Sequence, residues 1–312
     1  RMEDKIYNSA AIVSNHEILD SYQKMYLPNY GVFDEKRYFT EGSDFPVYDL
    51  DHVRFGVNVC EDIWFSPGPS DIQSDNGASL IININGSPFN LGKRSQREKV
   101  LIERAKSNGV FIAYINMVGG QDELVFDGGS LIVDPAGNIL MRANQFEENI
   151  YIYEIDLPTY KPCTTQDSVN KIKKVILPGI IKERSSNIPS TPLTIIDQKE
   201  EIYRALVLGT RDYVRKCGFT KALIALSGGI DSSLVAAIAV EALGSENVKG
   251  ISLPSKFSSS GSKVDAKKLA DNLEIPIDTI HIEEILQSME KGLNDQFQGT
   301  EWGVAEENLQ SR

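Results

Sequence analysis

A glycine-rich turn between two apolar runs constrains the fold of this chain more than any other feature. The turn is Ser227-Gly228-Gly229-Ile230-Asp231-Ser232-Ser233, and the apolar runs cover residues 222–226 and 234–240. The first run predicts a buried parallel strand, and the second predicts a helix. Glycines allow backbone N–H groups to approach an anion, and the N-terminus of a helix adds partial positive charge. The pattern therefore predicts a phosphate-binding turn.

The polar side chains of this turn suit a nucleotide phosphate. The hydroxyls of Ser227, Ser232 and Ser233 can donate hydrogen bonds to phosphate oxygens. Asp231 repels phosphate, so we expect it to hold a divalent cation, Mg²⁺, that bridges to the phosphate. The alternative is a Ser/Gly turn that only caps a helix, but such a turn needs neither two glycines nor an acid between hydroxyls.

The turn is not a Walker loop, because it has no lysine and no G-x-x-x-x-G-K-[ST] spacing. It resembles the pyrophosphate loop, SGGxDS, of the N-type ATP pyrophosphatases. Those enzymes cleave ATP between the α- and β-phosphates and adenylate an acyl or carbonyl oxygen. A nucleophile such as ammonia then displaces AMP. The resemblance therefore implies ATP as a ligand and AMP and pyrophosphate as products.

Length, charge and cysteine content set outer limits on the function. At 312 residues the chain is long enough for about two domains. The net charge of −12 argues against a surface that binds nucleic acid or an anionic membrane. Three scattered cysteines form neither a disulfide framework nor a zinc pattern, which favours a reducing, cytoplasmic compartment. No apolar run approaches the roughly 18 residues of a membrane helix.

Residues 1–157 predict a layered α/β domain in which short strands alternate with turns and one clear helix. The helix is expected at 93–107, with Gly109 as its stop signal. A hairpin turn is expected at 134–138. The expected strands are 7–13, 17–23, 53–59, 80–84, 110–115, 130–133 and 139–142.

Residues 158–196 predict a linker, because five prolines interrupt every regular pattern there. A second domain is expected at 197–312, beginning with a helix that Asp197 caps and Gly218 ends. Its further strands and helices alternate as in a doubly wound parallel sheet, which binds ligands at the carboxyl ends of its strands. They are expected at 222–226, 232–243, 248–253, 262–273 and 277–280.

A second set of motifs surrounds Cys60, which follows the strand expected at 53–59. A thiol at the end of a strand suits a nucleophile, and its thiolate needs a nearby cation or base. Alone, a cysteine at the end of a strand, such as Cys60, is more often a small packed residue, and a lone lysine, such as Lys24, is more often a solvated surface charge. Together, they belong to a larger pattern: Lys24 before L-P-x-Y-G-V-F-D-E, the run C-E-D-x-W at 60–64, Asn85-Gly86-Ser87-Pro88 and Phe126-Asp127-Gly128-Gly129-Ser130.

This pattern is similar to the glutaminase domain of the nitrilase superfamily. The resemblance implies an α-β-β-α sandwich that hydrolyses amides with a Glu–Lys–Cys triad. Cys60 is then the acylated nucleophile, and Lys24 stabilises the oxyanion together with the backbone N–H of Glu61. The positions that hold glutamine are then Tyr30, Glu61, Ser87 and Lys93. The family's base glutamate precedes the stretch seen here, so we expect it, with the first strand and helix, to lie outside this chain.

The two halves together resemble the glutamine-dependent NAD synthetases. The resemblance implies that ammonia from glutamine converts adenylated deamido-NAD into NAD, with further strands and helices after Arg312 and assembly into homo-oligomers. The segment 306–312 resembles E-E-N-L-Q-x-R, which implies contacts from Asn308 and Arg312 to deamido-NAD. The loop after residue 252 resembles the adenosine side of the ATP site. The implied ATP contacts are Ser227, Gly228, Gly229, Asp231, Ser232, Ser233, Leu253 and Ser262.

Other functions remain open from the sequence. Asparagine- and GMP-forming synthases share the pyrophosphate loop, but they carry unrelated glutaminase domains without C-E-D-x-W. A stand-alone amidase of the nitrilase type has no need for a phosphate-binding turn, so the turn at 227–233 argues against this function. A non-catalytic binding or assembly module is the alternative from a different class, and the missing base glutamate favours it.

Overall fold

The computed structural model describes residues 5–159, 172–179, 195–256, 258–293, 295–296 and 303. The chain divides into two compact units. One comprises Arg1–Gly119 and Leu124–Glu201, and the other comprises Gly120–Glu123 and Ile202–Arg312. The domain boundaries at 157 and 196 stay a prediction.

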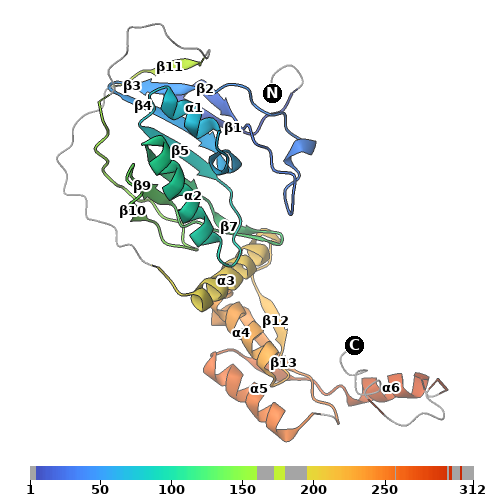
Figure 1. Ribbon diagram of the computed structural model, residues 1–312. Coiled ribbons are helices and arrows are strands. Elements are labelled where there is room, and N and C mark those ends of the chain that lie inside the picture. The colour runs from blue at the N-terminus through green and yellow to red at the C-terminus, as the bar shows by residue number, and fades with distance from the viewer. Residues whose placement is uncertain are drawn as a thin grey trace. The chain divides into compact units, whose positions relative to one another are not determined.

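In the described part of the first unit, seven strands form one mixed sheet (Figure 1). The centre of the sheet is parallel, because β4 pairs with β5 and β5 pairs with β6 in the same direction. Antiparallel neighbours flank this centre on both sides. In sheet order the strands are β10 (Ile139–Arg142), β9 (Leu131–Val133), β6 (Phe111–Asn116), β5 (Leu80–Asn85), β4 (Val53–Val59), β3 (Val47–Leu50) and β11 (Lys174–Leu177).

Helices cover one face of this sheet, and a strand hairpin covers the other. Helices α1 (Pro69–Asp75) and α2 (Lys93–Asn108) contact each other and the central strands (Figure 1). The hairpin of β1 (Ser9–Ser14) and β2 (Glu17–Gln23) packs against β4. Ile81 belongs to the hydrophobic cluster under the helices, and its neighbour Ile82 packs against the cluster under the hairpin. Successive strand residues face opposite sides of a sheet, so the two clusters lie on opposite faces.

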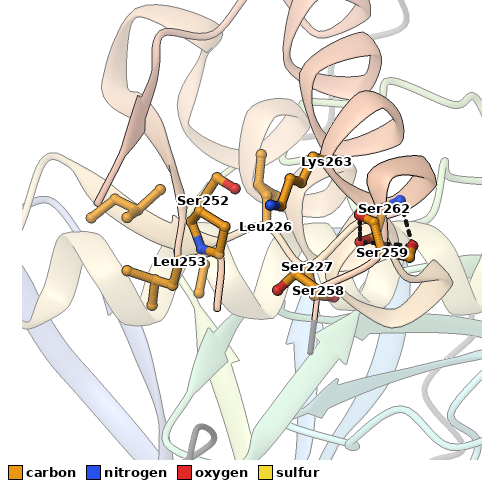
Figure 2. A pocket seen from close by; sticks show the side chains of 11 residues that line it. Leu226, Ser227, Ser252, Leu253, Ser258, Ser259, Ser262 and Lys263 are labelled. Carbon is orange, nitrogen blue, oxygen red and sulfur yellow. Dashed lines mark hydrogen bonds between the residues drawn. The ribbon is translucent and has the colours of Figure 1, made fainter. Parts of the chain in front are cut away.

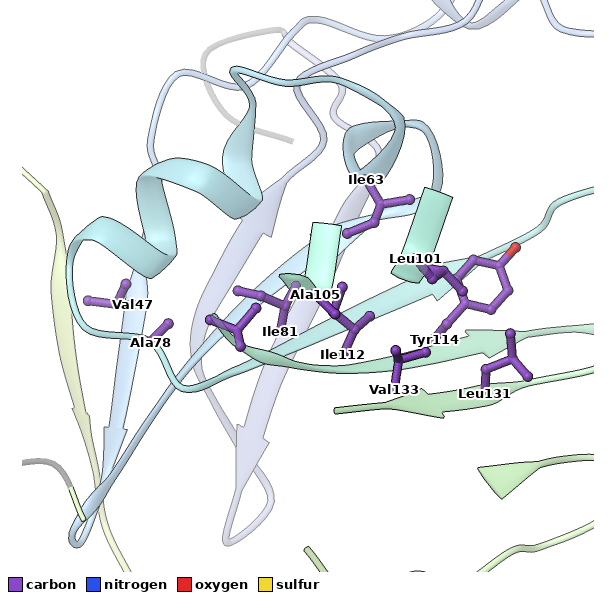
Figure 3. Close-up of a cluster of buried hydrophobic side chains, with 11 residues drawn as sticks. Val47, Ile63, Ala78, Ile81, Leu101, Ala105, Ile112, Tyr114, Leu131 and Val133 are labelled. Atoms are coloured by element: carbon purple, nitrogen blue, oxygen red, sulfur yellow. The ribbon is translucent and has the colours of Figure 1, made fainter. Parts of the chain in front are cut away.

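The cluster under the helices is the main core of the first unit. Figure 3 shows Ile63, Leu101, Tyr114 and Val133 among its members, all of them buried. The predicted helix at 93–107 is confirmed, because α2 ends before Gly109, whose φ is +63°. Such a left-handed residue is a common helix stop, and glycine adopts it without strain.

Several elements before residue 128 were not expected from the sequence. They are β3, α1, and the hairpin of β7 (Val118–Gln121) and β8 (Leu124–Asp127). The prediction of a linker without regular structure at 158–196 is wrong at one place, since β11 lies inside it. β11 pairs in parallel with β3, from Lys174 opposite Val47 to Leu177 opposite Leu50. The proline-rich residues 185–192 lie outside the described part of the chain.

The second unit contains a parallel sheet with helices between its strands. The described strands β12 (Ala222–Ala225), β13 (Val248–Ser252) and β14 (Ile277–Thr279) pair in chain order. Helices α4 (Ile230–Leu243) and α5 (Ser260–Asn272) share one buried cluster with β13, so both cover the same face. The parallel α/β arrangement is confirmed, whereas helices on both faces stay a prediction.

Two further helices lie mostly or wholly in the second unit, which the first of them enters at Ile202. Helix α3 (Gln198–Lys216) begins after Asp197, whose Oδ1 accepts the backbone N–H groups of Lys199 and Glu200 at 2.8 and 3.1 Å. Asp197 therefore caps the helix as the sequence predicts. Helix α6 (Glu283–Leu293) was not expected. Among the described residues, no helix combines the length and apolar content needed to cross a lipid bilayer.

Candidate active site

Cys60 lies where strand β4 ends. It is the first residue of a single-turn 3-10 helix, Cys60–Trp64, and its φ of +47° lies in the left-handed region. For a residue other than glycine this backbone costs about 1–3 kcal/mol, so the surrounding structure must hold it. The side chain is buried. A strained, buried thiol at a strand end is an arrangement that active sites often use.

Lys24 follows strand β2 and is only 1% exposed. Its Nζ contacts both carboxylate oxygens of Glu35, at 2.7 and 2.8 Å. The structure therefore supplies the counter-charge that a buried ammonium needs. Lys24 also lies close enough to Cys60 to lower the pKa of its thiol. The structure thus brings the two residues together, while their chemical roles stay a prediction.

The pKa of the Cys60 thiol is raised above its ordinary value, mainly because the side chain is buried. Lys24 and the backbone N–H of Gly86 lower this pKa, whereas the charges of Glu61 and Glu35 raise it. In the ligand-free protein the thiol is therefore protonated near neutral pH. A nucleophile of this kind needs its proton removed when substrate binds.

Glu35 is a residue that the sequence analysis missed. It lies in the motif that carries the resemblance, eleven positions after Lys24, at the start of the short 3-10 helix Glu35–Arg37. Sequence alone shows an acid among several charged residues, which is typical of a solvated turn. An available signal was its place inside the motif that carries the resemblance, shortly after Val32 and Phe33.

Three of the four predicted glutamine contacts converge near Cys60. The hydroxyl of Tyr30 donates to Glu61 Oε1 at 2.8 Å. The Nζ of Lys93 lies 4.3 Å from the centre of the Trp64 ring. The Cys60 thiol affects the pKa of Tyr30, which burial raises to about 12, and that of Lys93, which burial lowers. The Glu61 carboxylate can accept hydrogen bonds from an α-ammonium group, and Lys93 can pair with an α-carboxylate. The arrangement therefore suits a zwitterionic amino acid.

Ser87, the fourth predicted contact, lies in a buried polar network. Its Oγ accepts a hydrogen bond from Arg97 Nε at 3.1 Å. Arg97 also contacts both carboxylate oxygens of Asp127, at 2.7 and 2.9 Å, and Gln145 donates to the same carboxylate. The hydroxyl of Ser87 is therefore fixed by its neighbours. A direct contact between Ser87 and glutamine stays a prediction.

The second unit holds a pocket of about 560 Å³ at the carboxyl ends of β12 and β13. Figure 2 shows that the first turn of α5 closes one side of it. Parallel α/β sheets bind ligands at this edge. Of the predicted ATP contacts, Ser227, Leu253 and Ser262 line the pocket directly. The other five follow Ser227 in the same turn.

The turn at 227–233 is held in shape by its own polar groups. Ser227 Oγ accepts the backbone N–H of Gly229 at 3.2 Å and lies 3.1 Å from Ser232 Oγ. Ser232 and Ser233 both donate to the carbonyl oxygen of Gly229. Gly228 has φ +81°, and a Cβ there would lie 2.2 Å from the carbonyl oxygen of Ser262. Only glycine fits at 228 because the turn packs against the backbone of α5.

Two family models match the chain. Residues 1–164 match the carbon-nitrogen hydrolase family, and residues 202–312 match the NAD synthase family. The chain belongs to the carbon-nitrogen hydrolase family, and its two matched parts together are similar to the glutamine-dependent NAD synthetases. The resemblance to these synthetases is confirmed, and so is the fold class of a nitrilase-like domain followed by a parallel-sheet domain.

The relatives carry the name of these synthetases over nearly the whole chain. The glutamine-dependent NAD(+) synthetase of Thermotoga maritima is 44% identical, with 99% of this chain and 55% of the relative covered. The enzyme of Aquifex aeolicus is 42% identical, with 99% and 56% covered. The structure of the Acinetobacter baumannii enzyme in complex with ADP has a TM-score of 0.83 at 36% identity, with 99% and 54% covered. The chain spans about half the length of the curated relatives it matches.

Members of the glutamine-dependent NAD synthetase family use ATP. Asp231, the predicted Mg²⁺ ligand, is exposed in the first turn of α4. The described residues contain no group of three or more His, Cys, Asp or Glu side chains that could hold a metal. Mg²⁺ commonly binds through one or two carboxylates and substrate phosphates, so one acid beside a phosphate turn still fits it. Asn308 and Arg312 lie outside the described residues.

Lys263 lines the same pocket and was also missed by the sequence analysis. It lies in the first turn of α5, directly after Ser262 (Figure 2). The N-cap of this helix is Ser259, whose Oγ accepts the backbone N–H of Ser262 at 3.0 Å. The available signal was an N-cap serine followed four residues later by a lysine, in the loop that resembles the adenosine side of the ATP site.

Proposed function

We propose that this chain carries out the reaction of a glutamine-dependent NAD synthetase. In this reaction, glutamine is hydrolysed to glutamate and ammonia, and the ammonia amidates deamido-NAD at the expense of ATP. The observation that supports the proposal most strongly is that one chain combines two sites. A buried lysine acts on a strained cysteine in the first unit, and a phosphate-type turn borders a nucleotide-sized pocket in the second.

The glutaminase step begins when the Sγ of Cys60 attacks the side-chain amide carbon of glutamine. The Lys24 ammonium and the backbone N–H of Glu61 stabilise the negative oxygen that forms. The proton of the Cys60 thiol is transferred to the amide nitrogen, which leaves as ammonia, and water then cleaves the thioester to release glutamate and restore the thiol. Glu35 holds Lys24 in place through its two short contacts. Tyr30, Glu61, Ser87 and Lys93 select glutamine.

In the synthetase step, a carboxylate oxygen of deamido-NAD attacks the α-phosphorus of ATP, and pyrophosphate leaves. Ammonia then attacks the adenylated carbon, and AMP leaves. The backbone N–H groups and hydroxyls of the turn at 227–233 bind the departing pyrophosphate, and Lys263 adds positive charge. Asp231 would hold a bound Mg²⁺, which would neutralise charge on the phosphates. Leu253 and Ser262 border the nucleotide, and Asn308 and Arg312 contact deamido-NAD.

The same proposal covers location and assembly. Cytoplasmic NAD synthesis agrees with free cysteines at Cys60 and Cys217 among the described residues. Assembly into homo-oligomers is proposed from the family resemblance. The ADP complex of the Acinetobacter baumannii relative supports an adenine nucleotide as the ligand of the pocket in this chain.

The proposal is tested by measuring NAD formation by the intact gene product, with either glutamine or ammonia as nitrogen source. We expect Cys60→Ala to abolish the glutamine-supported reaction and to leave the ammonia-supported reaction near its wild-type rate. Cys217→Ala is the matched control, because that cysteine is exposed and lies in the other unit. Equal loss of both reactions in Cys60→Ala contradicts the scheme with two separate sites.

A further inference from the structure

The carboxylate of Asp62 lies between the two reactive segments of the first unit. Asp62 is 0% exposed and accepts four hydrogen bonds. Its Oδ1 accepts the backbone N–H groups of Met25 and Tyr26, at 3.1 and 2.9 Å. Its Oδ2 accepts the backbone N–H of Val59 at 3.0 Å and the hydroxyl of Tyr22 at 2.8 Å.

These four donors flank the two proposed catalytic residues. Tyr22 lies two positions before Lys24, and Met25 directly follows it. Val59 directly precedes Cys60, and Asp62 itself follows two positions later. The Asp62 carboxylate therefore bonds to the Tyr22 hydroxyl before Lys24, to two backbone N–H groups directly after Lys24, and to the backbone N–H directly before Cys60. The other described contacts of Lys24 include the Glu35 pair but no bond to the Cys60 turn.

We propose that Asp62 is a positioning residue that fixes the distance and orientation between Lys24 and Cys60. This inference rests on the proposed glutaminase function of that pair. Asp62 touches no reacting atom. It acts by holding two chain segments, 22–26 and 59–62, at a fixed separation. The ammonium of Lys24 and the backbone N–H of Glu61 can then contact the same oxyanion.

The chemistry of this site requires a carboxylate. An ionised carboxylate has about four acceptor positions and no donor, which matches four converging donors. An asparagine of the same shape keeps one acceptor oxygen and turns an NH₂ group toward two of the donors. Burial raises the pKa of Asp62, and the backbone N–H groups of Tyr26 and Val59 lower it. The hydrogen bonds thus offset a considerable desolvation cost, which a purely space-filling residue would not carry.

The test compares Asp62→Asn with Tyr22→Phe and Asp71→Asn in the intact gene product. Tyr22→Phe removes one of the four bonds and keeps the three from backbone groups. Asp71 is the matched control, because it accepts the backbone N–H of Gly68 at 2.8 Å but contacts neither reactive segment. Glutaminase kcat and KM, ammonia-supported NAD formation and the pH dependence of Cys60 alkylation by iodoacetamide are measured for each variant.

We expect Asp62→Asn to lower glutaminase kcat about 100-fold with little change in the KM for glutamine, because misplacement of about 1 Å can cost that much. Tyr22→Phe is expected to lower kcat about threefold to tenfold, and Asp71→Asn to leave it unchanged. If Lys24 moves away, the alkylation profile of Asp62→Asn shifts to higher pH. Simple loss of a negative charge would shift it to lower pH, so the direction identifies the cause.

Ammonia-supported NAD formation in Asp62→Asn shows that the second unit is folded, and differential scanning calorimetry shows whether the first unit is folded. If that reaction persists and glutaminase kcat remains wild-type, Asp62 is not a positioning residue. A shift of the alkylation profile to lower pH also overturns the inference. If Asp62→Asn loses both reactions, Tyr22→Phe decides, since wild-type kcat in that folded variant contradicts the inference. Failure of the proposed function is seen separately, as a glutaminase that survives Cys60→Ala.

Discussion

Gly228→Ala tests how the phosphate turn is packed. Gly228 has φ +81°, and its missing Cβ would lie 2.2 Å from the carbonyl oxygen of Ser262. Cβ atoms essentially never approach other atoms below 3.0 Å, so the turn and the first residues of α5 have to separate by about 0.8 Å. Both segments border the nucleotide pocket. The substitution is therefore expected to open the pocket as well as to strain the backbone.

Gly218→Ala is a matched control for this substitution. Gly218 has φ +79°, almost the same as Gly228, but no atom lies within 4 Å of its ideal Cβ. A left-handed alanine costs about 1–2 kcal/mol at either position. Overpacking against a backbone atom adds about 1–3 kcal/mol at Gly228 alone. We therefore expect Gly228→Ala to destabilise the second unit by about 2–5 kcal/mol and Gly218→Ala by about 1–2 kcal/mol.

The assay is titration calorimetry with ATP and Mg²⁺ on the intact gene product, together with differential scanning calorimetry. We expect the Kd for ATP to rise at least about tenfold in Gly228→Ala, which corresponds to about 1.4 kcal/mol, and to stay unchanged in Gly218→Ala. Wild-type ATP affinity in Gly228→Ala would refute the idea that this turn binds the phosphates. Equal destabilisation by both substitutions would refute the close packing against Ser262.

Two further predictions concern charges at the two sites. The first concerns the pKa of the Cys60 thiol, which Lys24 lowers and Glu35 raises. Lys24→Met is therefore expected to shift the pH profile of Cys60 alkylation to higher pH, and Glu35→Gln is expected to shift it to lower pH. Shifts in the same direction would contradict the proposed geometry. The second concerns Lys263. Lys263→Ala is expected to raise the KM for ATP about tenfold in the ammonia-supported reaction, since a hydrogen bond to a charged group contributes about 1.5–3 kcal/mol. Lys267→Ala is the control, because Lys267 pairs with Asp271 at 2.7 Å outside the pocket, and equal effects of the two substitutions would contradict the role of Lys263.

Elements with a strong local pattern could be predicted from the sequence. Strands 17–23 and 53–59 were found with their bounds, and helix α2 within a residue of its end. In these cases, the apolar period and a turn or stop residue agree, as at Asn15 and His16, which both have positive φ in the turn between β1 and β2. Such elements can be predicted from the sequence because the local pattern agrees with the final fold.

Elements whose stability comes from distant partners could not be predicted. Strand β11 has alternating exposure and pairs with β3, which lies more than 120 positions earlier in the chain. Prolines on both sides of 174–177 suggested a linker, and β-propensity is too weak to overrule that signal. β3 itself is only four residues long and gains its place by pairing with β4.

The same division separates the residues that carry chemistry from those that position them. Cys60 and Lys24 could be found from the sequence because their motifs are local. A thiol and an ammonium group also each have few chemical roles in an active site. Glu35 and Asp62 were within the same motifs, but a carboxylate in a sequence looks solvated until its partners are known. Glu35 has a buried ammonium as its partner. Asp62 has four donors, of which three lie 36 to 40 positions away and one, Val59, lies three positions away.

This arrangement predicts how the site responds to substitution. Lys24 directly follows strand β2, Glu35 begins one short 3-10 helix, and Cys60 begins another directly after strand β4. No single element holds all three, so their mutual geometry depends on polar contacts between elements. The strain at Cys60 costs about 1–3 kcal/mol and would relax once those contacts are lost. Activity is therefore expected to be more sensitive than stability to the loss of Asp62, because the core residues Ile81 and Ile112 hold the sheet together without it.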